Sequence, residues 1–252
     1  MGTLHFEVAD GVATLTLDEE KTRNAFSTAI AIEMLAACDA IDHDDSIGAA
    51  IIRGAHGTFC SGADRRDLLS PEGGKGMSGY RQEVQAAFVR FGELLVPTIA
   101  AVAGAAIGAG INLMLTADTR IVARDARLNA GFLRIGIHPG GGFYSLSNRV
   151  GGREVTAAMG LFGEEISGSR AVELGMAWEA VERDEVDPRA LELARRAASD
   201  PELSRVSLRS MRAIVGPPAS SWHAAVEIER GAQTWSRERL FARRAAEEAA
   251  RG

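Results

Sequence analysis

Two glycine-containing loops carry the residues whose types and spacing could perform chemistry. The first is GAAIGAGINLMLTAD, from Gly104 to Asp118, where small residues run directly into an apolar helix. The second is FCSGAD, from Phe59 to Asp64, where small residues and a glycine follow a strand. Small residues let the backbone approach a ligand closely, and a helix start presents free N–H groups and a positive dipole end. Two such loops facing each other could each give one N–H to a single oxygen, which is an oxyanion hole.

GAAIGAG is a weak match to the two common nucleotide-binding motifs. No Gly-Lys-Ser/Thr follows GAAIGAG, so it is not a Walker loop. Gly108 and Gly110 lack the third glycine of a dinucleotide fingerprint, and the loop is not an early βα turn with a suitable acidic residue downstream. The charge that the two loops could stabilise therefore need not belong to a phosphate.

Strands and helices are expected to alternate up to about residue 140 and to position these loops. Alternating runs on both sides of Asp10-Gly11 predict a β-hairpin, and Ser27 is a suitable N-cap for a helix with a stripe of apolar residues. The glycine-rich stretch from Ser70 to Gly79 is expected to be flexible. Further strands are expected in segments 49–54, 98–104, 119–123 and 126–131, and a further helix over about 80–94.

The composition changes after Phe143, and from there the chain is expected to be mainly helical, with a cap at Ser167. Its last segment, Trp222 to Arg251, predicts a long amphipathic helix that must bury its apolar surface on its own core or on a neighbouring subunit. Within this helical part we place a boundary that divides the chain into a core over residues 1–195 and a C-terminal helical region over residues 196–252.

The composition excludes several classes of function. With 28 basic and 34 acidic residues the net charge is -6, which argues against a nucleic-acid partner. Cys38 and Cys60 form no disulfide framework and have no metal-ligand spacing, so we expect a reduced, cytoplasmic protein without a metal. The uncharged stretch from Leu94 to Ala117 is long enough to span a membrane. Because it contains Pro97, glycines and Asn112, it indicates a buried strand, a turn and a buried helix instead.

Four motifs in order carry a resemblance: KTRNAFS (21–27), FCSGAD (59–64), VAGAAIGAGINLMLTADTRIV (102–122) and GIHPGGGF (136–143). Together they resemble the enoyl-CoA hydratase/isomerase family, also called the crotonase superfamily, over nearly the whole chain. The resemblance implies an α/β fold, a spiral of ββα units followed by a C-terminal helical trimerisation region. It also implies a homotrimer or a dimer of trimers, and a role in fatty acid metabolism.

The resemblance implies a site for an acyl- or enoyl-CoA thioester, with coenzyme A entering as part of the substrate and no permanently bound cofactor. By analogy, the backbone N–H groups of Ala63 and Ala109 would bind the thioester oxygen and stabilise an enolate. Arg23 and Ala25 fall where the family contacts the nucleotide end of coenzyme A, although Arg23 could equally be a solvated surface arginine. Asp64 is placed with this coenzyme-binding set, although its residue type favours a structural helix cap.

Hydratases of the family use two glutamates as base and acid, and the corresponding positions here are Asn112 and Phe132. An amide cannot take a proton, but Asn112 could hold a water or a substrate hydroxyl. Phe132 can only shape the substrate pocket, to which Pro139 and Gly140 are also assigned. Hydration by the two-glutamate mechanism is therefore not expected, and the same holds for isomerisation through a glutamate at the second position.

His138 is the best remaining candidate for proton transfer, because a histidine can titrate near neutral pH; the alternative is a loop histidine bonded to backbone. Tyr144 and Asp67 are remoter candidates, and Cys60 is more readily a small buried residue than a nucleophile. We expect an enzyme of CoA-thioester chemistry without the glutamate pair, through isomerisation, a lyase step or slow hydration. The alternative is a non-catalytic acyl-CoA-binding protein.

Overall fold

The structure, a computed structural model, describes residues 4–64, 66–67, 79–215 and 222–250. Most of the stretch expected to be flexible, residues 70–78, lies outside these described residues. Nine strands occur in the described part of the chain: β1 (Leu4–Ala9), β2 (Val12–Leu17), β3 (Ala49–Gly54), β4 (Thr98–Val102), β5 (Ala106–Ile107), β6 (Thr119–Ala123), β7 (Arg127–Asn129), β8 (Glu165–Ser167) and β9 (Glu179–Val181).

The α-helices of the described chain lie between the strands and, towards the C-terminus, follow one another. They are α1 (Thr28–His43), α3 (Gly79–Gly92), α4 (Ala109–Thr116), α5 (Phe143–Leu161), α6 (Gly168–Glu173), α7 (Val186–Ala198), α8 (Pro201–Val215) and α9 (Trp222–Ala249). Short 3-10 turns occur at η1 (Glu20–Thr22), η3 (Leu133–Ile135) and η4 (Arg183–Glu185).

A six-stranded sheet in the order β1-β2-β3-β4-β6-β9 forms the centre of the molecule. Only the β1–β2 pair is antiparallel; the other pairs of this sheet are parallel. A smaller sheet, β5-β7-β8, lies beside it. The predicted hairpin is confirmed, because Asp10 (φ 52°) and Gly11 (φ 73°) both adopt the left-handed conformation that a two-residue hairpin turn requires.

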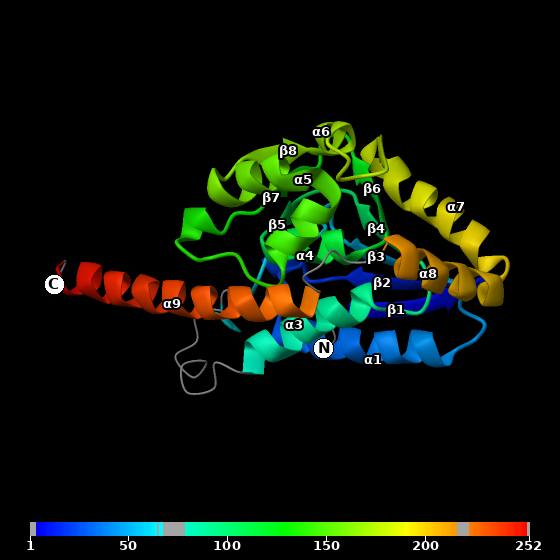
Figure 1. The fold of residues 1–252 in the computed structure, drawn as a ribbon, viewed down its shortest axis with the longest axis horizontal. Helices are drawn as coiled ribbons and strands as arrows, with labels where there is room; N and C mark the ends of the chain where they lie inside the picture. Colours follow the sequence, from blue (N-terminus) through cyan, green and yellow to red (C-terminus); the bar gives the residue numbers. More distant parts are fainter. Residues whose placement is uncertain (1–3, 65, 68–78, 216–221, 251–252) are drawn as a thin grey trace.

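Helices cover both faces of the large sheet (Figure 1). α1 and α3 pack side by side on one face, and α7 packs on the other. α1 begins as predicted, since the Ser27 Oγ accepts the Ile30 N–H at 3.3 Å. Its buried stripe includes Ile30, Met34 and Ile41, which join the continuous apolar core between α1 and the sheet.

The prediction of a mainly helical second half is confirmed, and this half also contains two short strands that were not predicted, β8 and β9. β9 pairs in parallel with β6 and adds the last strand to the central sheet. β8 pairs with β7 in the small sheet and ends at Ser167, whose Oγ caps α6 by accepting the Arg170 N–H, as predicted. Each strand has only three residues, too few for a periodic pattern to be read from the sequence.

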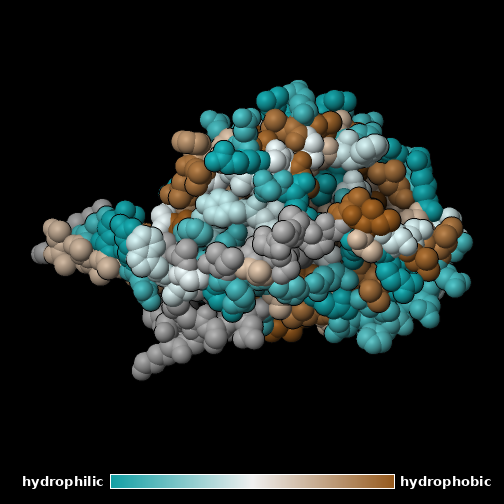
Figure 2. All heavy atoms as spheres, in the orientation of Figure 1, coloured by the Kyte–Doolittle hydropathy of each residue, from teal (hydrophilic) through white to brown (hydrophobic). Residues whose placement is uncertain are grey.

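The long C-terminal helix predicted over residues 222–251 is confirmed as α9, which projects well beyond the rest of the molecule (Figure 1). Its projecting end presents a mixture of hydrophilic and weakly hydrophobic residues (Figure 2). No helix among the described residues has the length and apolar character that crossing a membrane requires. The predicted boundary at residue 195 falls inside α7, and the division into two units stays a prediction.

Candidate functional site

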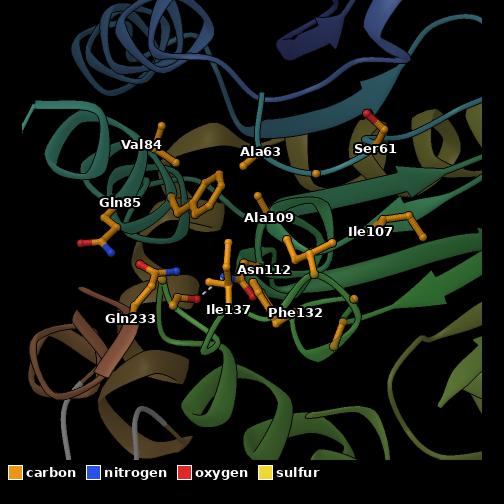
Figure 3. Close-up of a pocket in the computed structure, with 18 residues that line it drawn as sticks. Ser61, Ala63, Val84, Gln85, Ile107, Ala109, Asn112, Phe132, Ile137 and Gln233 are labelled. Carbon is orange, nitrogen blue, oxygen red and sulfur yellow. Dashed lines mark hydrogen bonds between the residues drawn. The ribbon is translucent and has the colours of Figure 1, made fainter. Parts of the chain in front are cut away.

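A cavity of about 200 Å³ lies where the two glycine-containing loops, α3, the 130–141 segment and α9 meet (Figure 3). Backbone and small side chains at Gly62, Ala63, Gly108 and Ala109 form part of its wall. Its larger apolar lining residues are Val84, Phe88, Ile107, Phe132, Ile135 and Ile137. Its polar lining side chains are Ser61, Gln85, Asn112 and Gln233.

The two loops are bonded to each other at their base. Cys60 and Ala106 form an isolated parallel bridge, and the Ile107 N–H donates to Cys60 O at 2.9 Å. The glycine of α4 packs directly on this contact, since a Cβ at Gly110 would lie 2.5 Å from Cys60 O. The two loops therefore face each other, as expected from the sequence, and backbone hydrogen bonds join them.

Each loop presents a glycine followed by an alanine at the cavity wall. Gly62 (φ 112°) and Gly108 (φ 55°) both adopt left-handed backbone conformations, which an L side chain rarely tolerates. A Cβ at Gly108 would lie 4.0 Å from the Gly62 Cα, so the two turns are close neighbours. This arrangement brings Ala63 and Ala109 to the same cavity.

The backbone N–H groups of both alanines are directed away from ordinary partners. Phe26 and Ala63 form an isolated parallel bridge in which Phe26 bonds to the two neighbours of Ala63. The Phe26 N–H donates to Gly62 O, and Phe26 O accepts the Asp64 N–H. In such a parallel bridge the N–H of the middle residue points to the opposite side. Ala109 is the first residue of α4, so its N–H has no acceptor within the helix. Both donors are thus suited to an oxygen in the cavity.

Asn112 lies one turn into α4 and is 2% exposed. Its Nδ2 donates to Gly140 O at 2.6 Å, and no described residue donates to its Oδ1. The side chain thus ties α4 to the later glycine loop, and Figure 3 shows this bond at the cavity. Asn112 reaches the cavity with an amide, which can accept a hydrogen bond but cannot act as a base at neutral pH.

Phe132 also lines the cavity, immediately before the 3-10 turn η3. Its ring packs edge-on against Phe143, with ring centroids 5.6 Å apart. An aromatic ring held in this way can shape an acyl pocket but cannot move a proton. Of the other two residues assigned to the pocket, Gly140 lines the cavity and Pro139 does not.

His138 does not line this cavity, although its neighbours Ile137 and Gly140 do. Its Nδ1 lies 2.6 Å from Pro139 O, and because a carbonyl only accepts, Nδ1 carries the proton. The ring stands edge-on to Tyr144 at 5.8 Å between centroids. In this structure the histidine is therefore held by the loop backbone and an aromatic neighbour, outside the cavity wall.

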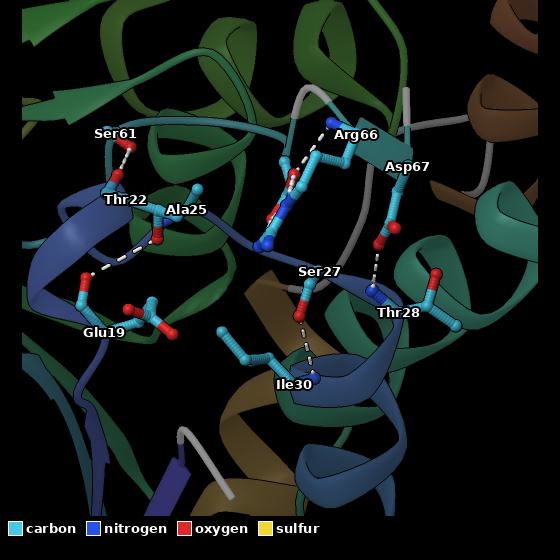
Figure 4. Close-up of polar contacts among 10 residues, drawn as sticks. Glu19, Thr22, Ala25, Ser27, Thr28, Ile30, Ser61, Arg66 and Asp67 are labelled. Atoms are coloured by element: carbon cyan, nitrogen blue, oxygen red, sulfur yellow. Dashed lines mark hydrogen bonds and ion pairs between the residues drawn. The ribbon is translucent and has the colours of Figure 1, made fainter. Parts of the chain in front are cut away.

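The proposed coenzyme-binding residues Arg23 and Ala25 lie in a segment that is hydrogen-bonded to the Ser61–Ala63 loop; Figure 4 shows Ala25 and the bond from the Ser61 hydroxyl to Thr22 O. Arg23 has a left-handed backbone (φ 55°), and its carbonyl accepts the Ser61 N–H at 3.1 Å. Ala25 is buried, and its N–H donates to the Thr22 Oγ1 at 3.3 Å. Neither residue lines the cavity, although the segment that carries them bonds to the loop that does.

Asp64 is 4% exposed and lies outside the cavity wall. Its carboxylate accepts both the backbone N–H and the guanidinium of Arg66, and the hydrogen bond from the guanidinium lowers the pKa of Asp64. Asp67 accepts the N–H of Thr28 at the start of α1 at 2.8 Å (Figure 4). Both carboxylates thus stabilise local backbone, as helix caps do.

The two cysteines are buried and unpaired. Burial raises the pKa of the Cys60 thiol to about 12, so the thiolate needed for nucleophilic attack does not form at neutral pH. Cys60 instead fills space at the contact between the two loops. Among the described residues no group of three or more His, Cys, Asp or Glu side chains is placed to hold a metal ion.

Glu229 of α9 is the residue near this site that sequence reasoning missed. It is 4% exposed, and its carboxylate accepts the N–H groups of Gly142 at 2.8 Å and Tyr144 at 3.1 Å. Burial raises the pKa of Glu229 to about 7, although backbone hydrogen bonds at the start of α5 oppose the rise. The signal in the sequence is indirect: PGGGF places no capping side chain before a helix, so an acceptor must come from elsewhere.

Gln85 of α3 and Gln233 of α9 were also missed, and both line the cavity (Figure 3). Gln85 Oε1 accepts from Arg230 at 3.1 Å, which fixes the orientation of the Gln85 amide. The Gln233 amide lies so close to Gly140 that a Cβ there would overlap it. These two glutamines, Ser61 and Asn112 are the polar side chains of the described lining, and none of them is ionisable.

Comparison with known proteins identifies the family. A family model described as enoyl-CoA hydratase/isomerase matches residues 7–232. A probable enoyl-CoA hydratase of Mycobacterium tuberculosis is 35% identical over 82% of this chain and 80% of that protein. The 1,2-epoxyphenylacetyl-CoA isomerase of Escherichia coli is 33% identical over 77% of this chain and 75% of that protein.

Solved structures show the same fold. An enoyl-CoA hydratase/isomerase from Pseudoalteromonas atlantica superposes with a TM-score of 0.83 at 22% identity, covering 93% of this chain and 91% of that one. A probable enoyl-CoA hydratase/isomerase from Mycobacterium abscessus superposes with a TM-score of 0.74 at 33% identity, covering 96% and 91%. The fold predicted from the motifs is thus confirmed, and the chain belongs to the enoyl-CoA hydratase/isomerase family.

Proposed function

We propose that the cavity binds the acyl end of an acyl- or enoyl-CoA thioester and stabilises its enolate. The thioester oxygen would accept the N–H groups of Ala63 and Ala109, and negative charge developing on that oxygen would strengthen both bonds. The observation that carries this proposal is the pair of Gly–Ala turns, Gly62-Ala63 and Gly108-Ala109, whose alanine N–H groups border one cavity without ladder or helix acceptors. Losing one such donor typically lowers a rate by about 10²–10³.

The lining restricts the reactions that this enolate could enter. With Asn112 and Phe132 where hydratases of the family carry glutamates, and with no ionisable group in the described lining, the protein offers no acid–base pair there. We therefore favour an isomerase or lyase step, or slow hydration, in which a held water or His138 moves the proton. His138 can act in this way only if its ring leaves Pro139 and turns towards the substrate.

A second candidate is a non-catalytic acyl-CoA-binding protein. The same absence of ionisable groups from the described lining favours it, because a pocket that only binds needs no proton donor. The relatives named above are an isomerase and a probable hydratase, and for that reason we place the enzyme first.

The coenzyme would lie along the Arg23–Ala25 segment and enter only as part of the substrate.

We also propose a cytoplasmic homotrimer or dimer of trimers. Exposed apolar side chains on α8 and α9 support assembly: Leu203, Val206, Met211, Ile214, Trp235 and Phe241. Light scattering coupled to size-exclusion chromatography would test this, and a monomer at micromolar concentration would contradict it.

The function is tested by incubating the protein with crotonyl-CoA and longer enoyl-CoAs and following loss of the conjugated thioester. Binding of butyryl-CoA is measured in parallel. Turnover at an ordinary hydratase rate would show that Asn112 and Phe132 do not prevent hydration. Tight binding without turnover of any thioester would favour the carrier, and failure of every thioester to bind more tightly than free coenzyme A would refute the proposal.

A further inference from the structure

We propose that Gln85 selects acyl groups that carry a neutral oxygen, such as that of a ketone, several carbons from the thioester. Its Nε2 would donate a hydrogen bond to that oxygen. This inference rests on the proposed function, since it assumes that a CoA thioester occupies the cavity. It adds to that function a class of acyl group and the residue that recognises it.

The orientation of the Gln85 amide is determined by Arg230 of α9. A guanidinium only donates, so the amide atom that lies 3.1 Å from Arg230 Nη2 is the oxygen Oε1. The other corner of the planar amide is therefore the donor Nε2. Figure 3 shows this nitrogen on the side of the amide that faces Gln233.

Gln85 Nε2 is accessible to a ligand. No described residue accepts a hydrogen bond from it, yet it is not among the described side-chain atoms that are both fully buried and unpaired. Gln85 separates the cavity from a second hollow between α1, α3 and α9, and Arg230 lines only that second hollow. Because Oε1 is held on the Arg230 side, Nε2 is the atom of the amide that is left for the cavity.

The course of the wall places Gln85 beyond the part of the cavity next to the thioester. Ala109 and Asn112 lie one turn apart on α4. A Cβ at Gly141 would lie 2.7 Å from Asn112 Nδ2 and 3.7 Å from Phe88 Cδ2, so these two side chains meet at the same glycine. Gln85 precedes Phe88 by nearly one turn of α3, about 4.5 Å along the axis. An acyl chain held at Ala109 would therefore pass Asn112 and Phe88 before it reaches Gln85.

The surroundings favour a neutral acceptor over a carboxylate. The positive charge of Arg230 is already paired with Glu227, whose Oε1 lies 2.8 Å from Arg230 Nη2. Since no polar side chain of the described lining is ionisable, a carboxylate would lose its hydration there without gaining a counter-ion. The hydrogen bond from Arg230 nevertheless polarises the Gln85 amide, which makes Nε2 a stronger donor to a neutral oxygen.

A donor in this wall distinguishes between acyl groups of similar shape. The large lining side chains near Gln85, Val84 and Phe88, are apolar and offer an acyl oxygen no hydrogen bond. A saturated chain would displace water from Nε2 without replacing its hydrogen bond, whereas a ketone would replace it. One hydrogen bond of this kind typically changes affinity by about threefold to tenfold.

The test compares hexanoyl-CoA, its 4-oxo and 5-oxo derivatives and free coenzyme A by isothermal titration calorimetry. The wild type is expected to bind at least one oxo thioester about threefold to tenfold more tightly than hexanoyl-CoA. The carboxylate of Gln85→Glu has nearly the same size and can accept from Arg230, but it cannot donate. In that variant, and in Gln85→Leu, hexanoyl-CoA should bind more tightly than either oxo thioester.

Infrared spectroscopy of the bound oxo thioester, labelled with ¹³C at the ketone, gives a readout that a merely structural role of Gln85 would not change. A hydrogen bond from Nε2 should lower the ketone stretching frequency in the wild-type complex relative to the Gln85→Leu complex. Ala86→Ser is the control, because Ala86 is exposed beside Gln85 on α3 and does not line the cavity. It should leave both the preference and the frequency unchanged.

Two results would overturn the inference and leave the proposed function intact. One is equal binding of the three thioesters to the wild type, and the other is a preference for an oxo thioester that persists in both Gln85 variants. If none of the thioesters binds more tightly than free coenzyme A, the proposed function itself is refuted.

Discussion

The carboxylate of Glu229 lies 2.8 Å from the backbone nitrogen of Gly142, and this contact joins the last helix of the chain to the first turn of α5. One turn further along α9, Gln233 lies against Gly140 at the cavity wall. Gly140 in turn accepts from Asn112 of α4. The glycine loop of the cavity is thus held from one side by α9 and from the other by α4.

The buried carboxyl of Glu229 predicts a pH-dependent stability. Because burial raises its folded-state pKa from 4.5 to about 7, the folded protein binds this proton more tightly than the unfolded chain does. The stabilisation is fully present below about pH 4.5 and is lost as the pH rises through about 7. Between those values the free energy of unfolding should fall by up to about 1.4 kcal/mol per pH unit relative to Glu229→Gln.

This prediction is measured by urea unfolding of the wild type and Glu229→Gln at pH 5, 6, 7 and 8. Glu227→Gln serves as control, because Glu227 is exposed on the same helix. Its pH profile should follow that of the wild type. Parallel profiles for the wild type and Glu229→Gln would show that Glu229 does not take up a proton on folding.

Gly110 is expected to tolerate no side chain. A Cβ there would lie 2.5 Å from Cys60 O and force the two loops apart, so Gly110→Ala should lose about 1–3 kcal/mol of stability and at least about tenfold in thioester affinity. Gly231→Ala is the control: Gly231 lies in α9 with no atom within 4 Å of its would-be Cβ, and alanine should stabilise the helix by about 0.5–1 kcal/mol. Thermal unfolding measures the change in stability, and calorimetry measures the change in thioester affinity. If Gly110→Ala bound the thioester as tightly as the wild type, the contact between the two loops would not be needed for binding.

Restoring the two carboxyl groups should create hydratase activity. The double substitution Asn112→Glu with Phe132→Glu places an acid and a base at the cavity wall, each able to transfer a proton. We expect crotonyl-CoA hydration to rise about 10²-fold or more over the wild type, with either single substitution giving much less. A folded double variant that binds butyryl-CoA but shows no gain would mean that these positions do not face the reacting carbons.

Cys60 should be unreactive in the native protein. Its side chain is fully buried, and burial raises its pKa to about 12, as it does for Cys38. Neither thiol should be alkylated by iodoacetamide at pH 7.5 within an hour, and both should react fully in denaturant. Mass spectrometry of the alkylated protein provides the measurement. Rapid native labelling at Cys60 would instead indicate an accessible, ionised thiol beside the cavity.

The sequence by itself determined the features that depend on neighbouring residues. Asp10-Gly11 specifies its hairpin because both residues can adopt left-handed conformations, and Ser27 starts α1 because its hydroxyl reaches a backbone N–H three residues on. The order of the glycine motifs indicated the family and its fold. In each case the controlling interaction lies within a few residues or within one motif.

Only the tertiary structure decided the features that depend on distant contacts. β9 has three residues and no readable period, and it is a strand because β6 offers it a parallel edge. Glu229 caps a helix that begins 86 residues earlier in the chain, and no local pattern records that pairing. His138 was the best acid–base candidate from the sequence, but its ring bonds to Pro139 O, stands edge-on to Tyr144 and does not line the cavity. Residue type sets what a side chain can do, whereas the packing around it decides which group it meets.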